Sequence, residues 1–147
     1  MTIVSILLAA GQGTRMRSKL PKVLHQIAGR PMVWHALRSV RDLVDVPPVL
    51  VVGYRAEKVK EAVKAEVAFV LQEEQLGTGH AVACARSALE GKADTVLVTF
   101  ADMPLLRKES LEALLALHRA GQGSVSMTGF VGDDAQGVGW LDRHNAG

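Results

Sequence analysis

The feature that most constrains the fold of this chain is a repeated alternation between short apolar runs and amphipathic helical patterns. The apolar runs lie at residues 3–8, 49–52, 67–71 and 95–100, and each is followed by a loop and a helical pattern. They are rich in Val, Ile and Leu and lack polar alternation, which is typical of parallel strands buried on both faces. The pattern predicts βαβ units, and therefore an α/β fold with a mostly parallel, Rossmann-like sheet and helices on both faces.

The segments between these runs have the spacing of helices that pack one side against a sheet. From Pro31, a residue suited to a first helical turn, apolar side chains recur at three- and four-residue intervals as far as Val44. The same spacing predicts further helices at residues 57–66, 79–89 and 108–120. Thr78 is a suitable N-cap for the second of these, and residues 124–130 are compatible with one more strand.

Length and composition favour one globular domain. The chain has 147 residues, 48% of them hydrophobic, which is enough to fill a single core. Its net charge of +2 includes no basic run, so nucleic acid is not expected as a partner. Residues 1–10 lack a basic leader, and no segment has the roughly 20 apolar residues of a membrane span, so we expect no membrane association. The single cysteine, Cys84, cannot form an internal disulfide, which fits a cytoplasmic location.

The first candidate site is the loop after the first apolar run. Residues 8–16 read Leu-Ala-Ala-Gly-Gln-Gly-Thr-Arg-Met, and Lys22 follows shortly after. Small residues and glycines let the backbone approach a ligand, and successive N–H groups in such a turn form an anion-binding nest. Because Arg15 and Lys22 add two cations, the loop is predicted to bind phosphate. The alternative interpretation is a tight turn without a ligand.

Two known phosphate-binding motifs do not match this loop. It is not a Walker A loop, because no Gly-Lys-Ser/Thr follows a four-residue gap. It also departs from the dinucleotide-binding fingerprint, because Met16 stands at the position of the third glycine. Phosphate binding of another type is therefore indicated.

A second candidate site lies at residues 71–81, after the third apolar run. The amide of Gln72 both donates and accepts hydrogen bonds, and the backbone of Gly77 and Thr78 can approach a base edge, so the segment suits recognition of a nucleotide base. The alternative is an ordinary capped helix start. His80 is interpreted as a structural helix residue, because no second ligand stands at metal-binding spacing from it.

The third candidate is Asp102, directly after the fourth apolar run. Ligands bind at the carboxyl ends of strands in open α/β sheets. A carboxylate beside phosphates suits Mg²⁺, which takes one or two carboxylates together with phosphates and waters. Asp102 is therefore a candidate Mg²⁺ ligand, and the alternative is a surface acid that caps the turn held by Pro104.

Together, these three segments resemble the uridylyltransferase domain of bacterial N-acetylglucosamine-1-phosphate uridylyltransferases, which are usually fused to a glucosamine-1-phosphate acetyltransferase. The resemblance spans essentially the whole chain and is most specific at residues 8–16, 21–25 and 71–81. It implies a fold of the nucleotide-diphospho-sugar transferase type and Mg²⁺-dependent transfer of UMP from UTP to N-acetylglucosamine 1-phosphate, which gives UDP-N-acetylglucosamine and pyrophosphate.

The resemblance also implies roles for individual residues. The nucleotide would be held by Leu8, Ala9, Ala10, Gly11, Gly13, Lys22, Gln72, Gln75, Gly77 and Thr78. Arg15, Lys22 and the metal ligand Asp102 would act in catalysis. The substrate side would be formed by Phe100, Ala101, Asp102 and Gly139. That side departs from the family pattern, because Phe100 replaces a tyrosine, Ala101 a glycine and Trp140 an arginine.

We expect residues 1–147 to form one nucleotidyltransferase domain, limited to its nucleotide-binding portion and incomplete at the C-terminus. The family's remaining sugar contacts, its second metal ligand and its acetyltransferase β-helix are not in this sequence, and full-length members are expected to be homo-oligomers through that absent domain. Four alternatives stay open: transfer to another sugar phosphate, cytidylyl transfer, molybdopterin guanylyl transfer, and a noncatalytic nucleotide-binding module.

Overall fold

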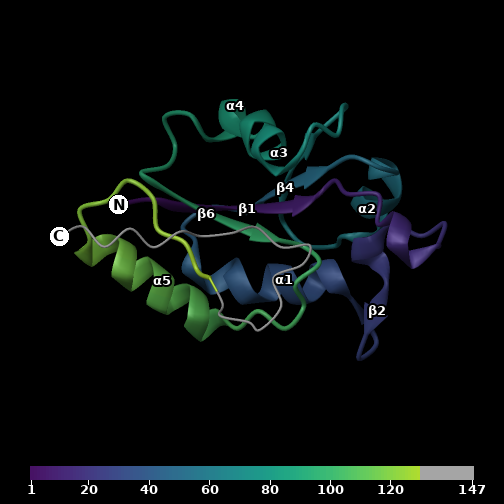
Figure 1. The fold of residues 1–147 in the computed structure, drawn as a ribbon, viewed down its shortest axis with the longest axis horizontal. Helices are drawn as coiled ribbons and strands as arrows, with labels where there is room; N and C mark the ends of the chain where they lie inside the picture. Colours follow the sequence, from purple (N-terminus) through teal and green to yellow (C-terminus); the bar gives the residue numbers. More distant parts are fainter. Residues whose placement is uncertain (130–147) are drawn as a thin grey trace. The chain divides into compact units, whose positions relative to one another are not determined.

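A computed structural model of the chain describes residues 1–129, and the chain divides into two compact units at residues 110 and 111. The first unit holds a four-stranded parallel sheet in the order β5-β4-β1-β6 (Figure 1). The strands are β1 (Ile3–Ala9), β4 (Val49–Val52), β5 (Ala68–Leu71) and β6 (Thr95–Phe100). Central β1 pairs with both neighbours, and its Leu7 lies opposite Leu50 of β4 and Thr99 of β6. The predicted α/β fold with a parallel sheet is confirmed.

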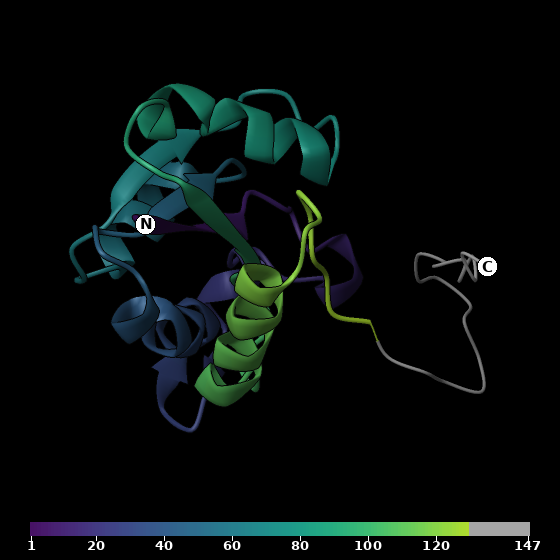
Figure 2. The same cartoon turned by 90° about the vertical axis from the view of Figure 1, so that its left-hand side faces the viewer.

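Helices cover both faces of this sheet. Figures 1 and 2 show α3 (Thr78–Cys84) and α4 (Arg86–Leu89) on one face, with α1 (Met32–Val40) on the other. Because side chains alternate along a strand, β1 contributes to both interfaces. The core on the α3 side comprises Val4, Ile6, Leu8, Ala10, Val49, Val51, Ala81, Ala85 and Leu89. The remaining helix of this unit, α2 (Ala56–Ala62), connects β4 to β5.

The helices of the first unit are shorter than their apolar spacing predicts. Helix α1 ends at Val40, and a 3₁₀ turn, η3 (Arg41–Leu43), follows it. The predicted helix at 79–89 is divided at Ala85 into α3 and α4. Thr78 is not the N-cap of α3, because Gly77 occupies the cap position with φ of 104° and no side chain caps the helix. The positive φ turns the chain into the helix and places Thr78 inside the first turn.

A hairpin that the sequence patterns do not predict follows the first strand. Strands β2 (Gln26–Ile27) and β3 (Arg30–Pro31) pair antiparallel around Ala28 and Gly29. Both turn residues have positive φ, 50° and 76°, as a type I′ turn requires. His35 Nε2 lies 2.8 Å from the Ile27 carbonyl, which ties the hairpin to α1.

The second unit contains most of α5 (Lys108–Ala120), the helix predicted at the same residues. It ends where the Gly121 N–H donates to the Leu117 carbonyl at 3.0 Å. Residues 124–129 contain no strand, so the expectation of a strand there is wrong. This segment instead contacts the helix, with Ser126 Oγ 3.1 Å from His118 Nδ1. Within residues 1–129, no helix has the length and apolar character needed to cross a bilayer.

Candidate active site

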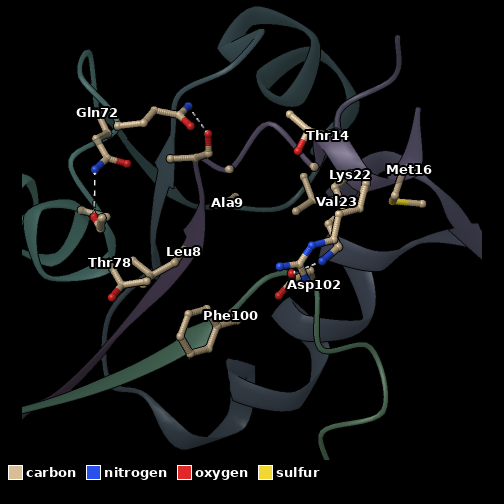
Figure 3. A pocket seen from close by; sticks show the side chains of 17 residues that line it. Leu8, Ala9, Thr14, Met16, Lys22, Val23, Gln72, Thr78, Phe100 and Asp102 are labelled. Atoms are coloured by element: carbon tan, nitrogen blue, oxygen red, sulfur yellow. Dashed lines mark hydrogen bonds and ion pairs between the residues drawn. The ribbon is translucent and has the colours of Figure 1, made fainter. Parts of the chain in front are cut away.

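The loops after β1, β5 and β6 enclose a cavity of about 450 Å³ at the carboxyl ends of these strands (Figure 3). Parallel strands place their following loops at one edge of the sheet, so segments far apart in the chain meet there. The cavity brings together nearly all of the predicted site residues: Leu8, Ala9, Ala10, Gly11, Gly13, Arg15, Lys22, Gln72, Gln75, Gly77, Thr78, Phe100 and Asp102.

Two predicted substrate residues are not among those that line the cavity. Ala101 is fully buried, and its N–H donates to the Leu8 carbonyl at 3.0 Å. Its methyl group therefore belongs to the interior and does not replace a glycine at the ligand surface. Gly139 lies outside the described residues, as does Trp140.

Four lining residues were not singled out from the sequence: Thr14, Met16, Val23 and Ala81. All lie within or beside the predicted motifs. Thr14 and Met16 belong to a short 3₁₀ turn, η1 (Thr14–Met16), and Val23 follows Lys22. These residues could have been predicted from their position within or next to the phosphate loop and the start of the helix.

The two glycines of the phosphate loop differ in what surrounds them. Gly13 has φ of 66°, and a Cβ added there would lie 2.7 Å from Lys22 Cβ. A Cβ added at Gly11 would have nothing within 4 Å. Gly13 therefore lets the loop lie against the aliphatic stem of Lys22, while Gly11 leaves the backbone open toward the cavity.

The carbonyl of Ala10 joins three strand ends. It accepts a hydrogen bond from the Tyr54 N–H at 3.2 Å and another from the side-chain amide of Gln75. A Cβ on Gly53 would lie 2.9 Å from this carbonyl oxygen and 3.0 Å from Gln75 Nε2. Gly53 is thus a residue on which the site depends and which sequence reasoning missed. Its signal is a glycine directly after the buried strand β4, which often marks a close backbone approach.

Gln72 holds one side of the cavity. The residue is 4% exposed, and its Nε2 lies 3.1 Å from the Gly77 carbonyl oxygen and 3.0 Å from His80 Nδ1. Figure 3 shows Gln72 and Thr78 on one side of the cavity, with Leu8 and Ala9 between them and the charged residues opposite. The amide oxygen of Gln72 can accept a hydrogen bond, so this side suits a planar polar ring that carries an N–H, such as a base.

The opposite side carries an ion pair between Lys22 and Asp102, whose Nζ and Oδ2 atoms are 2.6 Å apart. Lys22 begins the 3₁₀ turn η2 (Lys22–Leu24), and Asp102 lies two residues after β6. Both side chains remain partly open to solvent, at 39% and 30% exposure. Arg15 also lines this cavity and is exposed. The arrangement provides cations for a polyphosphate and a carboxylate for a metal ion.

The residues present fit a Mg²⁺ ion that is held mostly by its substrate. Among residues 1–129, no group of three or more His, Cys, Asp or Glu side chains is placed to hold a metal. Asp102 is the carboxylate of this cavity, and it already lies against a cation, the Lys22 ammonium. A single carboxylate completed by phosphate oxygens and waters is a usual protein environment for Mg²⁺.

Comparison with known proteins gives consistent results. A model of the MobA-like NTP transferase domain matches residues 5–144. The "Bifunctional protein GlmU" of Exiguobacterium sp. is 46% identical over 97% of this chain and 32% of its own length. The protein of the same name from Pelobacter propionicus is 48% identical over 99% and 32%. The chain thus spans about a third of these curated relatives, whose similarity confirms the resemblance found in the motifs.

Solved structures share the fold. The manganese complex of Rv0371C from Mycobacterium tuberculosis H37Rv superposes with a TM-score of 0.68 at 20% identity, over 82% of this chain and 61% of that one. UDP-glucose pyrophosphorylase from Acinetobacter baumanii has a TM-score of 0.57 at 24% identity, over 67% and 45%. At these sequence identities, the similarity concerns the fold alone.

Proposed function

The chain belongs to the MobA-like NTP transferase domain family, and we propose that this nucleotidyltransferase domain transfers UMP from UTP to N-acetylglucosamine 1-phosphate. The observation that carries the proposal is the cavity itself, with the Gln72 amide on one side and the Lys22–Asp102 ion pair on the other. The choice of sugar phosphate rests on the motif resemblance and on the bifunctional relatives.

The proposed binding mode follows the cavity from side to side. The uracil base lies against Gln72 and the backbone of Gly77 and Thr78, and the small residues after β1 let the nucleotide approach the main chain. The triphosphate reaches Arg15 and Lys22. A planar guanidinium and a compact ammonium suit phosphate oxygens in different ways, the first by bidentate hydrogen bonds and the second as a point charge.

The proposed reaction is an in-line attack by a sugar-phosphate oxygen on the α-phosphorus of UTP. A new P–O bond forms to the sugar phosphate, the bond from the α-phosphorus to the bridging oxygen breaks, and pyrophosphate leaves with the electron pair. Since the nucleophile is already ionised near neutral pH, no general base is needed, and catalysis depends on alignment and charge neutralisation. Lys22 and Arg15 stabilise negative charge on the triphosphate and on the departing pyrophosphate.

We propose that Asp102 holds Mg²⁺ together with phosphate oxygens. Mg²⁺, when bound, would supply positive charge that offsets the negative charge of the phosphates. The manganese complex of a protein with the same fold supports a divalent ion in this type of domain. The same carboxylate forms an ion pair with the Lys22 ammonium.

The test is calorimetric titration of the chain with UTP, CTP, GTP and dTTP in the presence of Mg²⁺, together with an assay of pyrophosphate release. We expect UTP to bind most tightly. Tightest binding of CTP or GTP would overturn the uridylyl assignment in favour of a cytidylyl- or guanylyltransferase. UTP binding without N-acetylglucosamine 1-phosphate binding or pyrophosphate release would favour a noncatalytic nucleotide-binding module.

The metal role is tested by Asp102→Asn, which keeps the size of the side chain and removes its charge. We expect the gain in UTP affinity on adding Mg²⁺ to fall by about tenfold or more, because the ion loses its protein ligand. Glu73→Gln is the matched control, since Glu73 is an exposed acid that does not line the cavity. An unchanged Mg²⁺ effect in Asp102→Asn would remove Asp102 from this role.

A further inference from the structure

We infer that His80 controls which base the cavity accepts, by fixing the orientation of the Gln72 side-chain amide. The inference rests on the proposed function, because it takes Gln72 to be the residue that contacts the base. It assigns a positioning role to a histidine that the sequence pattern alone identifies as an ordinary helix residue.

The orientation of the amide follows from the group beside it. A carbonyl oxygen only accepts hydrogen bonds, so the Gln72 atom 3.1 Å from the Gly77 carbonyl oxygen must be the NH₂ group. That nitrogen also lies 3.0 Å from His80 Nδ1. Its second hydrogen therefore points to Nδ1, which must be the unprotonated nitrogen of the ring. The ring hydrogen is then on Nε2, which lies 3.8 Å from Cys84 Sγ.

Both amide hydrogens of Gln72 are consequently used inside the protein. Gln72 is buried, with 4% of the residue exposed, but it lines the cavity, and its Oε1 receives no hydrogen bond from residues 1–129. Figure 3 shows the oxygen of the labelled Gln72 amide pointing to the side of Ala9, away from the dashed hydrogen bond that the amide nitrogen makes. Gln72 therefore presents an acceptor to the ligand and has no donor left for it.

An acceptor at this position selects among bases. The ring N3 of uracil carries a hydrogen and can donate to Oε1, whereas N3 of cytosine has a lone pair that would face the oxygen. A rotated amide would present NH₂ and suit cytosine. Rotation would, however, place Oε1 against the Gly77 carbonyl oxygen, which only accepts, and would require His80 to carry its ring hydrogen on Nδ1 instead of Nε2. His80 thus provides one of the two hydrogen bonds that hold the amide in its uracil-selective orientation.

The decisive measurement is the ratio of UTP to CTP affinity, obtained by calorimetry with Mg²⁺ for the full chain and two variants. His80→Leu removes the acceptor, and we expect the ratio to fall by about tenfold, the effect of one neutral hydrogen bond. His80→Asn is the conservative control, because its Oδ1 can take the place of Nδ1, and we expect it to keep most of the ratio. An unchanged ratio in His80→Leu, or an equal fall in both variants, would overturn the inference.

A spectroscopic measurement on the unmodified chain covers the case in which His80→Leu does not fold. Long-range ¹H–¹⁵N NMR spectra distinguish the two neutral tautomers of each of the five histidines, and His80→Asn identifies the signals of His80. We expect the tautomer with hydrogen on Nε2. The tautomer with hydrogen on Nδ1 would overturn the inference.

These outcomes are distinct from a failure of the proposed function. If the unmodified chain shows no preference for UTP over CTP, both the uridylyl assignment and this inference fail. If it prefers UTP and His80→Leu keeps that preference, the assignment stands and the role of His80 is wrong.

Discussion

Lys22 reaches Asp102 because Gly13 has no side chain. The left-handed backbone of Gly13 brings the phosphate loop onto the stem of Lys22, whose ammonium contacts the Asp102 carboxylate on the same side of the cavity. Residues 80 positions apart in the chain are joined in this way. The Lys22–Asp102 ion pair therefore depends on the backbone conformation of Gly13.

Replacing Gly13 by alanine should disturb the contact between the phosphate loop and Lys22. A side chain at φ of 66° is strained, and its Cβ would lie 2.7 Å from Lys22 Cβ. We expect the free energy of unfolding to fall by about 1–2 kcal/mol, and UTP affinity to weaken as Lys22 is displaced. Urea denaturation and calorimetry measure the two effects.

Gly11→Ala is the control for stability, since its Cβ would meet no atom within 4 Å. We expect its free energy of unfolding to stay within about 0.5 kcal/mol of the unmodified chain. Equal stability of the Gly11→Ala and Gly13→Ala chains would contradict this account of the loop.

At the scale of elements, the site depends on how closely the ends of β1 and β4 approach each other. Gly53→Ala would place a methyl group within 2.9 Å of the Ala10 carbonyl oxygen. We expect it to lower the free energy of unfolding by about 1–3 kcal/mol, because backbone cannot move aside as a flexible side chain can. Chemical denaturation gives this value, and UTP affinity should fall with the displacement of Gln75.

Gly79→Ala is the comparison variant for Gly53→Ala, because we expect it to stabilise the chain. Gly79 lies inside α3, and an added Cβ would have nothing within 4 Å. Alanine is a better helix former than glycine, so we expect this variant to gain up to about 1 kcal/mol of stability. Destabilisation by Gly79→Ala, or full stability of Gly53→Ala, would show that these local surroundings do not decide the outcome.

The elements that the sequence predicted well are those in which local pattern and tertiary packing agree. The apolar runs of β4 and β6 and the stripe of α5 give the observed bounds. Strand β4 is buried at every position, as its unbroken apolar run predicts, whereas β6 buries Thr95, Leu97 and Thr99 and leaves its other three residues exposed, so the expectation of burial on both faces is wrong for β6. The hairpin of β2 and β3 has two-residue strands, too short for periodicity to reveal. The end of α1 and the division at Ala85 change a helix that the apolar spacing would continue, so spacing cannot locate them.

The site, like the elements, was predictable only in part from the sequence. Ligands bind at the carboxyl ends of parallel strands, and this rule correctly predicted that the glycine loop, the Gln72 segment and Asp102 lie together. The rule succeeds because it depends only on the order of the parallel strands. The direction of individual side chains depends on register and backbone angles. Ala101 is therefore buried behind the cavity, and His80 contacts Gln72 through a turn that the sequence does not specify.

At the scale of the whole molecule, the cavity is built from three strand ends of one compact unit, residues 1–110. A ligand that fills it contacts segments that unfolding would separate. Such a ligand binds the folded chain only, and its binding energy adds to the free energy of unfolding.

UTP with Mg²⁺ should therefore raise the thermal midpoint of the chain. At a ligand concentration 100 times Kd, the expected gain is about 2.7 kcal/mol, equivalent to about 5–10 °C for a chain of this size. Differential scanning fluorimetry measures the shift, and CTP at the same concentration should give a smaller one. Equal shifts for the two nucleotides would argue against selection of the base by Gln72.

The shared carbonyl of Ala10 also offers a way to observe this cavity in motion. The loop after β1 cannot swing outward without releasing the Tyr54 amide, which donates to that carbonyl. The rate of deuterium uptake at the Tyr54 N–H therefore reports how often the hydrogen bond to the Ala10 carbonyl opens. The measurement needs neither a label nor catalytic turnover.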